Sequence, residues 1–186
     1  IYNDTPEIRR QIYFMKECFK SIKKILAICW GMQVAVTAAG GEVKKSAKGS
    51  HIGIANDIEL TNEGLNNPLY KDKSNKFNTP AFNFDEVVTT PEGAIPLASN
   101  KINKIQGLNF KIGVSEIWGL QYHPEITYKK MIDIIKFRKD SLIKKRNRFK
   151  NEEEINNHIN FIEEENKITK KSSRMLEIRN WLKIIN

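Results

Sequence analysis

Cys29 and His123 are residue types that can together carry out nucleophilic catalysis. Cys29 follows a short apolar run at 25–28 and is flanked by the small residues Ala27 and Gly31. Small flanking residues are typical of a nucleophile elbow, a strained turn from a strand into a helix that lifts the side chain to the end of the sheet. The positive end of the helix favours the thiolate form there. A buried structural cysteine explains this stretch equally well when it is taken alone.

The second chemical motif is His123-Pro124-Glu125, which directly follows the apolar run 117–122. A histidine just beyond a strand end can reach the same sheet edge as the elbow. Glu125 can hydrogen-bond the other imidazole nitrogen and fix its tautomer. Taken alone, the motif is better explained as a surface turn stiffened by Pro124. Together with Cys29, it indicates a nucleophile, a base and a carboxylate that orients the base.

Together, the two motifs resemble those of the class I glutamine amidotransferase family. The family's elbow pattern, Gly-x-Cys-x-Gly-x-Gln, is matched by Ala-Ile-Cys-Trp-Gly-Met-Gln at 27–33. Its second signature, an aromatic residue before His-Pro-Glu, is matched at 122–125, and the histidine follows the cysteine by 94 residues (123 − 29). The resemblance covers about residues 4–136. It points to the stand-alone group similar to the amidotransferase domain of GMP synthase, a neighbourhood that includes plant γ-glutamyl peptidases.

The resemblance implies a role for each catalytic residue. Cys29 would attack the side-chain amide of glutamine and form a γ-glutamyl thioester. His123 would accept the thiol proton and then protonate the departing ammonia, while Glu125 orients His123.

Three further residues are assigned to substrate binding by the same resemblance. The backbone N–H of Trp30 would donate to the oxyanion, because it follows the nucleophile. Gly31 and Gln33 would line the substrate pocket. For Gln33, an ordinary polar residue on the first turn of a helix is an equally good interpretation.

The apolar periodicity predicts an α/β fold. A capping segment at 4–7 precedes a stripe that predicts a helix to about Lys23, and residues 25–28 predict a buried strand. Residues 32–39 predict a helix that ends at Gly40-Gly41. Short strands are expected at 52–55, 58–61, 86–89, 94–98, 105–110, 112–115 and 117–122. The resemblance implies a mostly parallel open sheet flanked by helices, of the flavodoxin-like, class I amidotransferase type.

Helices are predicted again from Thr127 onward. Asn151 before three glutamates predicts a helix N-cap. The inner face expected for the helices consists of Tyr128, Met131, Ile132, Ile135, Leu142, Ile155, Ile159 and Ile162, with Met175, Ile178, Trp181, Leu182 and Ile185 in the last segment. We expect residues 1–139 to form the amidotransferase-like domain. Residues 140–186 are expected to form a helical extension packed on it, because each helix has only a narrow apolar stripe.

Composition excludes several function classes. The 186 residues are 40% hydrophobic and 28% charged, as in one globular domain. The net charge of +9 could indicate a nucleic-acid partner, but the basic run at 144–150 has no aromatic platform, so a solvated helix end explains it better. No apolar run is long enough for a membrane span, and two cysteines predict a reducing cytoplasm. Because the sequence also has no zinc motif and no ATP-binding glycine-rich motif, we expect no metal, cofactor, nucleic-acid or membrane partner.

The sequence departs from the family pattern in three ways. Ala27 replaces the first glycine of the elbow, and Asn83-Phe84-Asp85 stands where many relatives have His-x-Asp, so a contact to a partner or acceptor is expected to differ. Relatives also carry a glycine-rich loop and two strands upstream of the region corresponding to Ile1, and that loop supplies the second oxyanion donor. We therefore expect an N-terminally truncated chain, in which loss of one donor lowers the rate on the order of 10²–10³-fold.

Three functional hypotheses remain open. The leading one is a glutamine amidotransferase that releases ammonia, passing it to a separate synthetase or to water. The second keeps the same triad but cleaves γ-glutamyl peptides or amides. The third is a catalytically impaired subunit that keeps the fold to bind a partner. Outside the motifs, Cys18 is expected to be structural, His51 to lie in a loop or line a pocket, and His158 to face solvent.

Overall fold

The elements around Cys29 form as the sequence predicts. The computed structural model describes residues 1–186. Helix α1 (Pro6–Ser21) begins at the N-cap Thr5, whose hydroxyl accepts from the N–H of Ile8 at 3.4 Å. Strand β1 (Lys24–Ile28) then leads through Cys29 into α2 (Trp30–Ala38). The chain leaves α2 at Gly40, whose φ of +87° is accessible to glycine. The structure confirms this strand–turn–helix unit.

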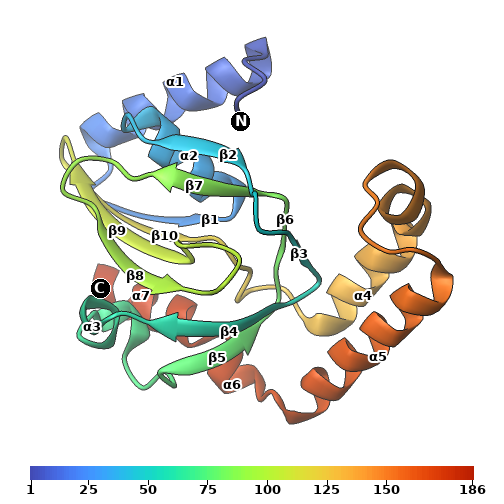
Figure 1. Ribbon diagram of the computed structural model, residues 1–186. Coiled ribbons are helices and arrows are strands. Elements are labelled where there is room, and N and C mark those ends of the chain that lie inside the picture. Colours follow the sequence, from blue (N-terminus) through green and yellow to red (C-terminus); the bar gives the residue numbers. More distant parts are fainter.

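Strand β1 lies at the edge of a six-stranded sheet with the order β1-β10-β9-β8-β4-β5 (Figure 1). Its other members are β4 (Ala55–Leu60), β5 (Lys76–Thr79), β8 (Ile95–Ser99), β9 (Gly107–Ile112) and β10 (Ser115–Leu120). β1 pairs with β10 in parallel, and the other pairings are antiparallel.

The α/β fold class is as expected, but the sheet is mixed rather than mostly parallel. For β9 and β10 the reason is the shortness of their connection, because a tight turn can join only antiparallel strands. Between β9 and β10 the turn consists of Gly113, with φ +58°, and Val114. It lies where a strand at 112–115 was expected.

Two short ribbons lie beside this sheet. β2 (Glu42–Lys45) pairs with β7 (Asp85–Thr89), and β3 (His51–Ile52) pairs with β6 (Phe82–Asn83). β2 and β6 have no marked apolar alternation, and the sequence did not predict them. Two short helices, α3 (Asn62–Leu65) and η1 (Pro68–Tyr70), follow β4.

The C-terminal part consists of helices. They are α4 (Tyr128–Phe137), the π-helical turn η2 (Ser141–Lys145), α5 (Glu152–Ile168), α6 (Lys171–Arg174) and α7 (Leu176–Ile185). The predicted N-cap is confirmed, since Asn151 Oδ1 accepts from the N–H of Glu154 at 3.0 Å. The inner faces of α4 and α5 form one apolar cluster with Ile52 and Ile54. None of the helices is long and apolar enough to cross a membrane.

The last helix fits its prediction only in part, since Trp181 packs against a core cluster as expected. Its apolar residues Leu182 and Ile185 are 47% and 40% exposed, whereas the polar residues Glu177 and Asn180 are 0% and 4% exposed. The helix packs against η1, and its polar side chains have partners about a hundred positions away in the sequence. Apolar periodicity cannot detect such a face.

Candidate active site

Cys29 lies in a strained turn between β1 and α2. Its φ of 49° and ψ of −103° are unusual for a residue with a side chain. The turn is held on both sides, since the N–H of Cys29 donates to the carbonyl of Leu120 at 2.6 Å and its carbonyl accepts from the N–H of Gln33 at 3.1 Å. The thiol is thereby fixed where β1 ends, beside the end of the paired strand β10. This geometry is that of a nucleophile elbow.

The replacement of glycine by Ala27 is accommodated in this elbow. Ala27 is 3% exposed. A Cβ atom placed on Gly31 would still lie 3.9 Å from the Cβ of Ala27, an ordinary van der Waals distance. The strand and helix therefore approach each other here without a clash.

His123 lies three residues beyond the end of β10 and pairs with Glu125. Its Nδ1 is 2.6 Å from Glu125 Oε1, and its backbone N–H donates to the carbonyl of Pro80 at 2.7 Å. Cys29 lies near this ring, since its side chain is among the groups that raise the pKa of His123. The three residues named by the two motifs are therefore together.

The electrostatics of this group favour a protonated imidazole. Burial acts to lower the pKa of His123, but the hydrogen bonds and negative charges of Cys29 and Glu125 outweigh it and raise the pKa to about 9. An imidazolium beside the thiol stabilises the thiolate, which is the nucleophilic form. It also carries the proton that a leaving amine needs.

Gln121 is a site residue that the sequence analysis did not assign. Its side-chain Nε2 donates to Cys29 Sγ at 3.6 Å, and its Oε1 accepts from Gln33 Nε2 at 3.3 Å. Residues two apart on an extended chain share a face, so the position of Gln121 two before His123 was the available signal. Gln33 is 4% exposed and supports Gln121; its role in the substrate pocket stays a prediction.

Trp30 occupies the first position of α2. Backbone N–H groups in the first turn of a helix have no intrahelical partner, so the N–H of Trp30 is available to an oxyanion beside Cys29. The indole is 39% exposed, and its Nε1 donates to Gln11 Oε1 at 2.5 Å.

The remaining candidate residues lie outside this group. Cys18 is buried in α1. His51 lies in β3 rather than in a loop, and it lines a pocket, as the second alternative had it. Burial lowers its pKa to about 4 against the opposing hydrogen bonds, and Gln106 Nε2 lies 2.8 Å from its Nε2. His158 was expected to face solvent, but its Nε2 donates to the carbonyl of Ile52 at 2.6 Å. That expectation was wrong because α5 packs directly against β3.

Asn83 and Asp85 are tied into the local backbone. Asn83 Nδ2 donates to the carbonyl of Asp85 at 3.0 Å, and the hydroxyl of Tyr2 donates to Asp85 Oδ1 at 3.1 Å. No group of three or more His, Cys, Asp or Glu side chains is arranged to hold a metal ion.

Comparisons with known proteins point to one family. The family model described as "Glutamine amidotransferase class-I" matches residues 3–139. The chain is 40% identical over 130 residues to gamma-glutamyl-L-1-hydroxyisopropylamide hydrolase of Pseudomonas sp, which covers 68% of the chain and 44% of that protein. It is 34% identical to a subunit of the glutamine-hydrolyzing GMP synthase of Methanocaldococcus jannaschii, over 69% of the chain and 64% of that protein. The chain thus spans about half the length of the curated relatives it matches.

The fold is also shared with solved structures. A glutamine amidotransferase from Thermotoga maritima aligns with a TM-score of 0.72 at 21% identity, over 98% of this chain and 71% of that one. An amidotransferase from Methylobacillus flagellatus aligns with a TM-score of 0.67 at 14% identity, over 97% and 70%. At these identities the likeness concerns the fold alone.

Proposed function

Because the chain belongs to the class I glutamine amidotransferase family, we propose that it hydrolyses the γ-amide of glutamine through a covalent intermediate on Cys29. The observation that carries the proposal is the meeting of the Cys29 elbow with the His123–Glu125 pair, whose nitrogen and oxygen are 2.6 Å apart. A nucleophile, a base and an orienting carboxylate are the requirements of this chemistry.

In the first half of the reaction, the Cys29 thiolate attacks the γ-carbonyl carbon of the substrate. The carbonyl oxygen gains negative charge, to which the N–H of Trp30 donates. The His123 imidazolium then gives its proton to the leaving nitrogen, the C–N bond breaks, and ammonia departs. A γ-glutamyl thioester remains on Cys29.

In the second half, neutral His123 takes a proton from a water molecule. The resulting hydroxide attacks the thioester carbonyl, the C–S bond breaks, and glutamate leaves. Cys29 returns as a thiolate and His123 as an imidazolium, the state from which the cycle began. Glu125 holds the imidazole tautomer and orientation throughout.

A second candidate substrate is a γ-glutamyl amide of a larger amine. The relative from Pseudomonas, at 40% identity, is named for such a hydrolysis. The acyl half of the reaction is unchanged and only the leaving group differs. Relatives named as subunits of a glutamine-hydrolyzing GMP synthase support the first candidate and, as a partner, a separate synthetase that accepts the ammonia.

The test compares products from the two substrate classes. The chain is incubated with glutamine and with γ-glutamyl amides, and ammonia, free amine and glutamate are quantified. We expect hydrolysis and a γ-glutamyl adduct detectable by mass spectrometry on Cys29, both lost in Cys29→Ser and retained in Cys18→Ser. If a glutamine-like electrophile labels Cys29 no faster than Cys18, the enzymatic proposal fails and a partner-binding role is the better explanation.

A further inference from the structure

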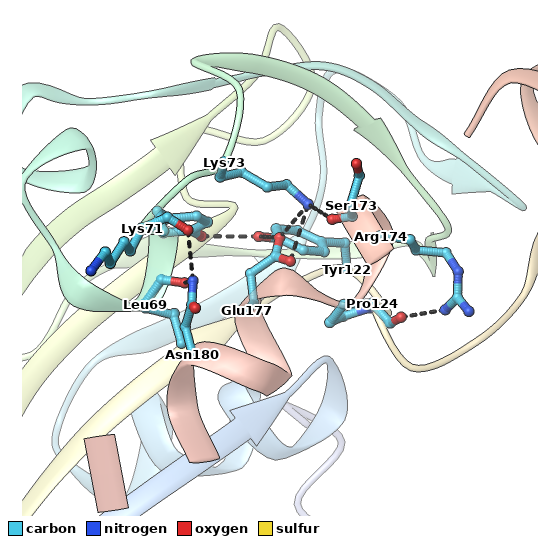
Figure 2. A network of polar contacts seen from close by, with 10 residues as sticks. Leu69, Lys71, Lys73, Tyr122, Pro124, Ser173, Arg174, Glu177 and Asn180 are labelled. Atoms are coloured by element: carbon cyan, nitrogen blue, oxygen red, sulfur yellow. Dashed lines mark hydrogen bonds and ion pairs between the residues drawn. The ribbon is translucent and has the colours of Figure 1, made fainter. Parts of the chain in front are cut away.

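The C-terminal segment contacts the chain on both sides of His123 (Figure 2). On the N-terminal side of His123, the buried hydroxyl of Tyr122 donates to Glu177 Oε1 at 2.7 Å. On the C-terminal side of His123, Arg174 Nη1 donates to the carbonyls of Pro124 and Ile126, the latter at 2.9 Å. The two carbonyls belong to the residues on either side of Glu125.

The anchoring of this segment is itself polar and buried. Lys73 Nζ contacts Glu177 and the carbonyl of Ser173, both at 3.0 Å, and the Lys73 and Glu177 side chains are 5% and 0% exposed (Figure 2). Asn180 Nδ2 donates to the carbonyls of Leu69 and Lys71 at 3.0 and 2.8 Å. These contacts fix the first half of α7, and with it the nearby residue Arg174.

The carboxylate of Glu125 has no comparable support of its own. Its side chain is 36% exposed, and His123 is its one side-chain hydrogen-bond partner. The turn that carries it is closed by a bond from the N–H of Ile126 to the carbonyl of His123 at 3.2 Å. The place of the carboxylate therefore depends on the backbone of residues 124–126, which Arg174 holds.

We propose that Arg174 is a positioning residue, which fixes the turn at Pro124 and Ile126 and so keeps the Glu125 carboxylate against His123. The proposal rests on the function proposed above for His123 and Glu125. Arg174 is 8% exposed, and burial lowers the pKa of its guanidinium, although the nearby charge of Glu125 opposes this. Hydrogen bonds from a charged donor are stronger than neutral ones, which suits a group that must hold an exposed turn.

The first test measures the His123 titration by NMR, which needs no substrate. Arg174→Gln removes the charge and shortens the side chain, so we expect the midpoint to fall from about 9 toward the ordinary histidine value. Arg174→Lys keeps the charge on a shorter side chain, so its His123 midpoint should lie between those of the wild type and of Arg174→Gln. Arg179→Gln is the matched control, because Arg179 is exposed on the following helix α7 and makes no side-chain hydrogen bond.

The second test measures turnover of the substrate identified in the product assay. A misplaced catalytic group can lower kcat on the order of 10²-fold, and we expect this for Arg174→Gln with little change in KM. A folded Arg174→Gln chain that titrates and turns over like Arg179→Gln would overturn the proposal. If Arg174→Gln does not fold, wild-type values in Arg174→Lys would overturn it. If the unmodified chain shows no turnover, the proposed function fails, and the titration still decides the role of Arg174.

Discussion

The raised pKa of His123 provides the sharpest test of the site. Its value of about 9 depends on Cys29 and Glu125, because burial alone would lower it. The difference from the ordinary value of about 6.5 corresponds to about 3 kcal/mol of preferential stabilisation of the imidazolium. Cys29→Ala removes one of the two side chains that raise the pKa of His123, so the midpoint must fall below about 9.

The assay is an NMR titration of the histidine ring protons. The chain has three histidines, and His51, with a pKa near 4, stays neutral over the range of interest. Cys18→Ala is the control and should keep the His123 midpoint near 9, since Cys18 lies in α1 away from the ring. An unchanged midpoint in Cys29→Ala, or a wild-type midpoint near 6.5, would refute the described electrostatics.

The same shift predicts a pH dependence of stability. The pKa of His123 is higher in the folded chain than in the unfolded one. Its contribution is therefore fully present below about pH 6.5 and is lost as the pH rises through about 9. Urea unfolding measures the free energy of unfolding of the wild type and of His123→Gln. As the pH rises over this range, the difference between the two free energies should shrink by up to about 3 kcal/mol. A difference between the two free energies that does not change with pH would contradict the raised pKa of His123 in the folded chain.

Two further predictions concern the packing of α4 and α5. A Cβ on Gly53, which has φ +84°, would lie 2.7 Å from the Cδ1 atoms of Ile135 and Ile162. Gly53→Ala should therefore destabilise the fold by about 1–3 kcal/mol more than Gly93→Ala, where φ is +68° and no atom lies within 4 Å. Ile162→Ala should cost about 2–5 kcal/mol, because Ile162 is fully buried, whereas Ile168→Ala should cost little, because Ile168 is 75% exposed. Urea unfolding measures the loss of stability in each variant. Equal losses in the two glycine variants, or in the two isoleucine variants, would contradict the described packing.

The parts of the site that the sequence predicted are those encoded locally. Cys29 and Gly31 lie in one short segment, and His123 and Glu125 in another, so each motif can be recognised without knowing the fold. The N-cap Asn151 is likewise defined by the residues that follow it. What joins the two motifs is the parallel pairing of β1 with β10, which the apolar runs suggest but do not specify.

The parts that the sequence did not predict depend on distant partners. Glu177 and Arg174 read as ordinary charged helix residues, yet both are buried because Lys73, Tyr122 and Pro124 lie opposite them. The prediction that His158 faces solvent was wrong for the same reason, because its partner, the carbonyl of Ile52, is distant in the sequence. Polar side chains are buried when a partner is present, and a partner about 50 to 100 positions away leaves no trace in local periodicity.

The buried pair of Lys73 and Glu177 is better explained by specificity than by stability. Burial lowers the pKa of Lys73 even though Glu177 opposes this, so the pair bears a desolvation penalty. Trp181 and Ile184 of α7 pack against a core cluster of the sheet, but Leu182 and Ile185 are 47% and 40% exposed, so apolar contacts alone select the register of α7 only weakly. The ion pair of Lys73 and Glu177 forms in only one register of α7, and so it selects that register.

This argument predicts an ordered set of stabilities. Lys73→Met alone leaves an unpaired buried carboxylate and should cost about 3–5 kcal/mol, whereas the double variant Lys73→Met, Glu177→Leu should recover much of that loss. In the double variant, however, α7 is held by Asn180 and by apolar contacts without the ion pair. Its register is then less firmly fixed, so the His123 midpoint should fall below about 9. Urea unfolding and the histidine titration measure the two effects separately. A double variant that regains stability and also keeps the wild-type titration would show that the buried pair does not transmit order from the C-terminal helix to the catalytic turn.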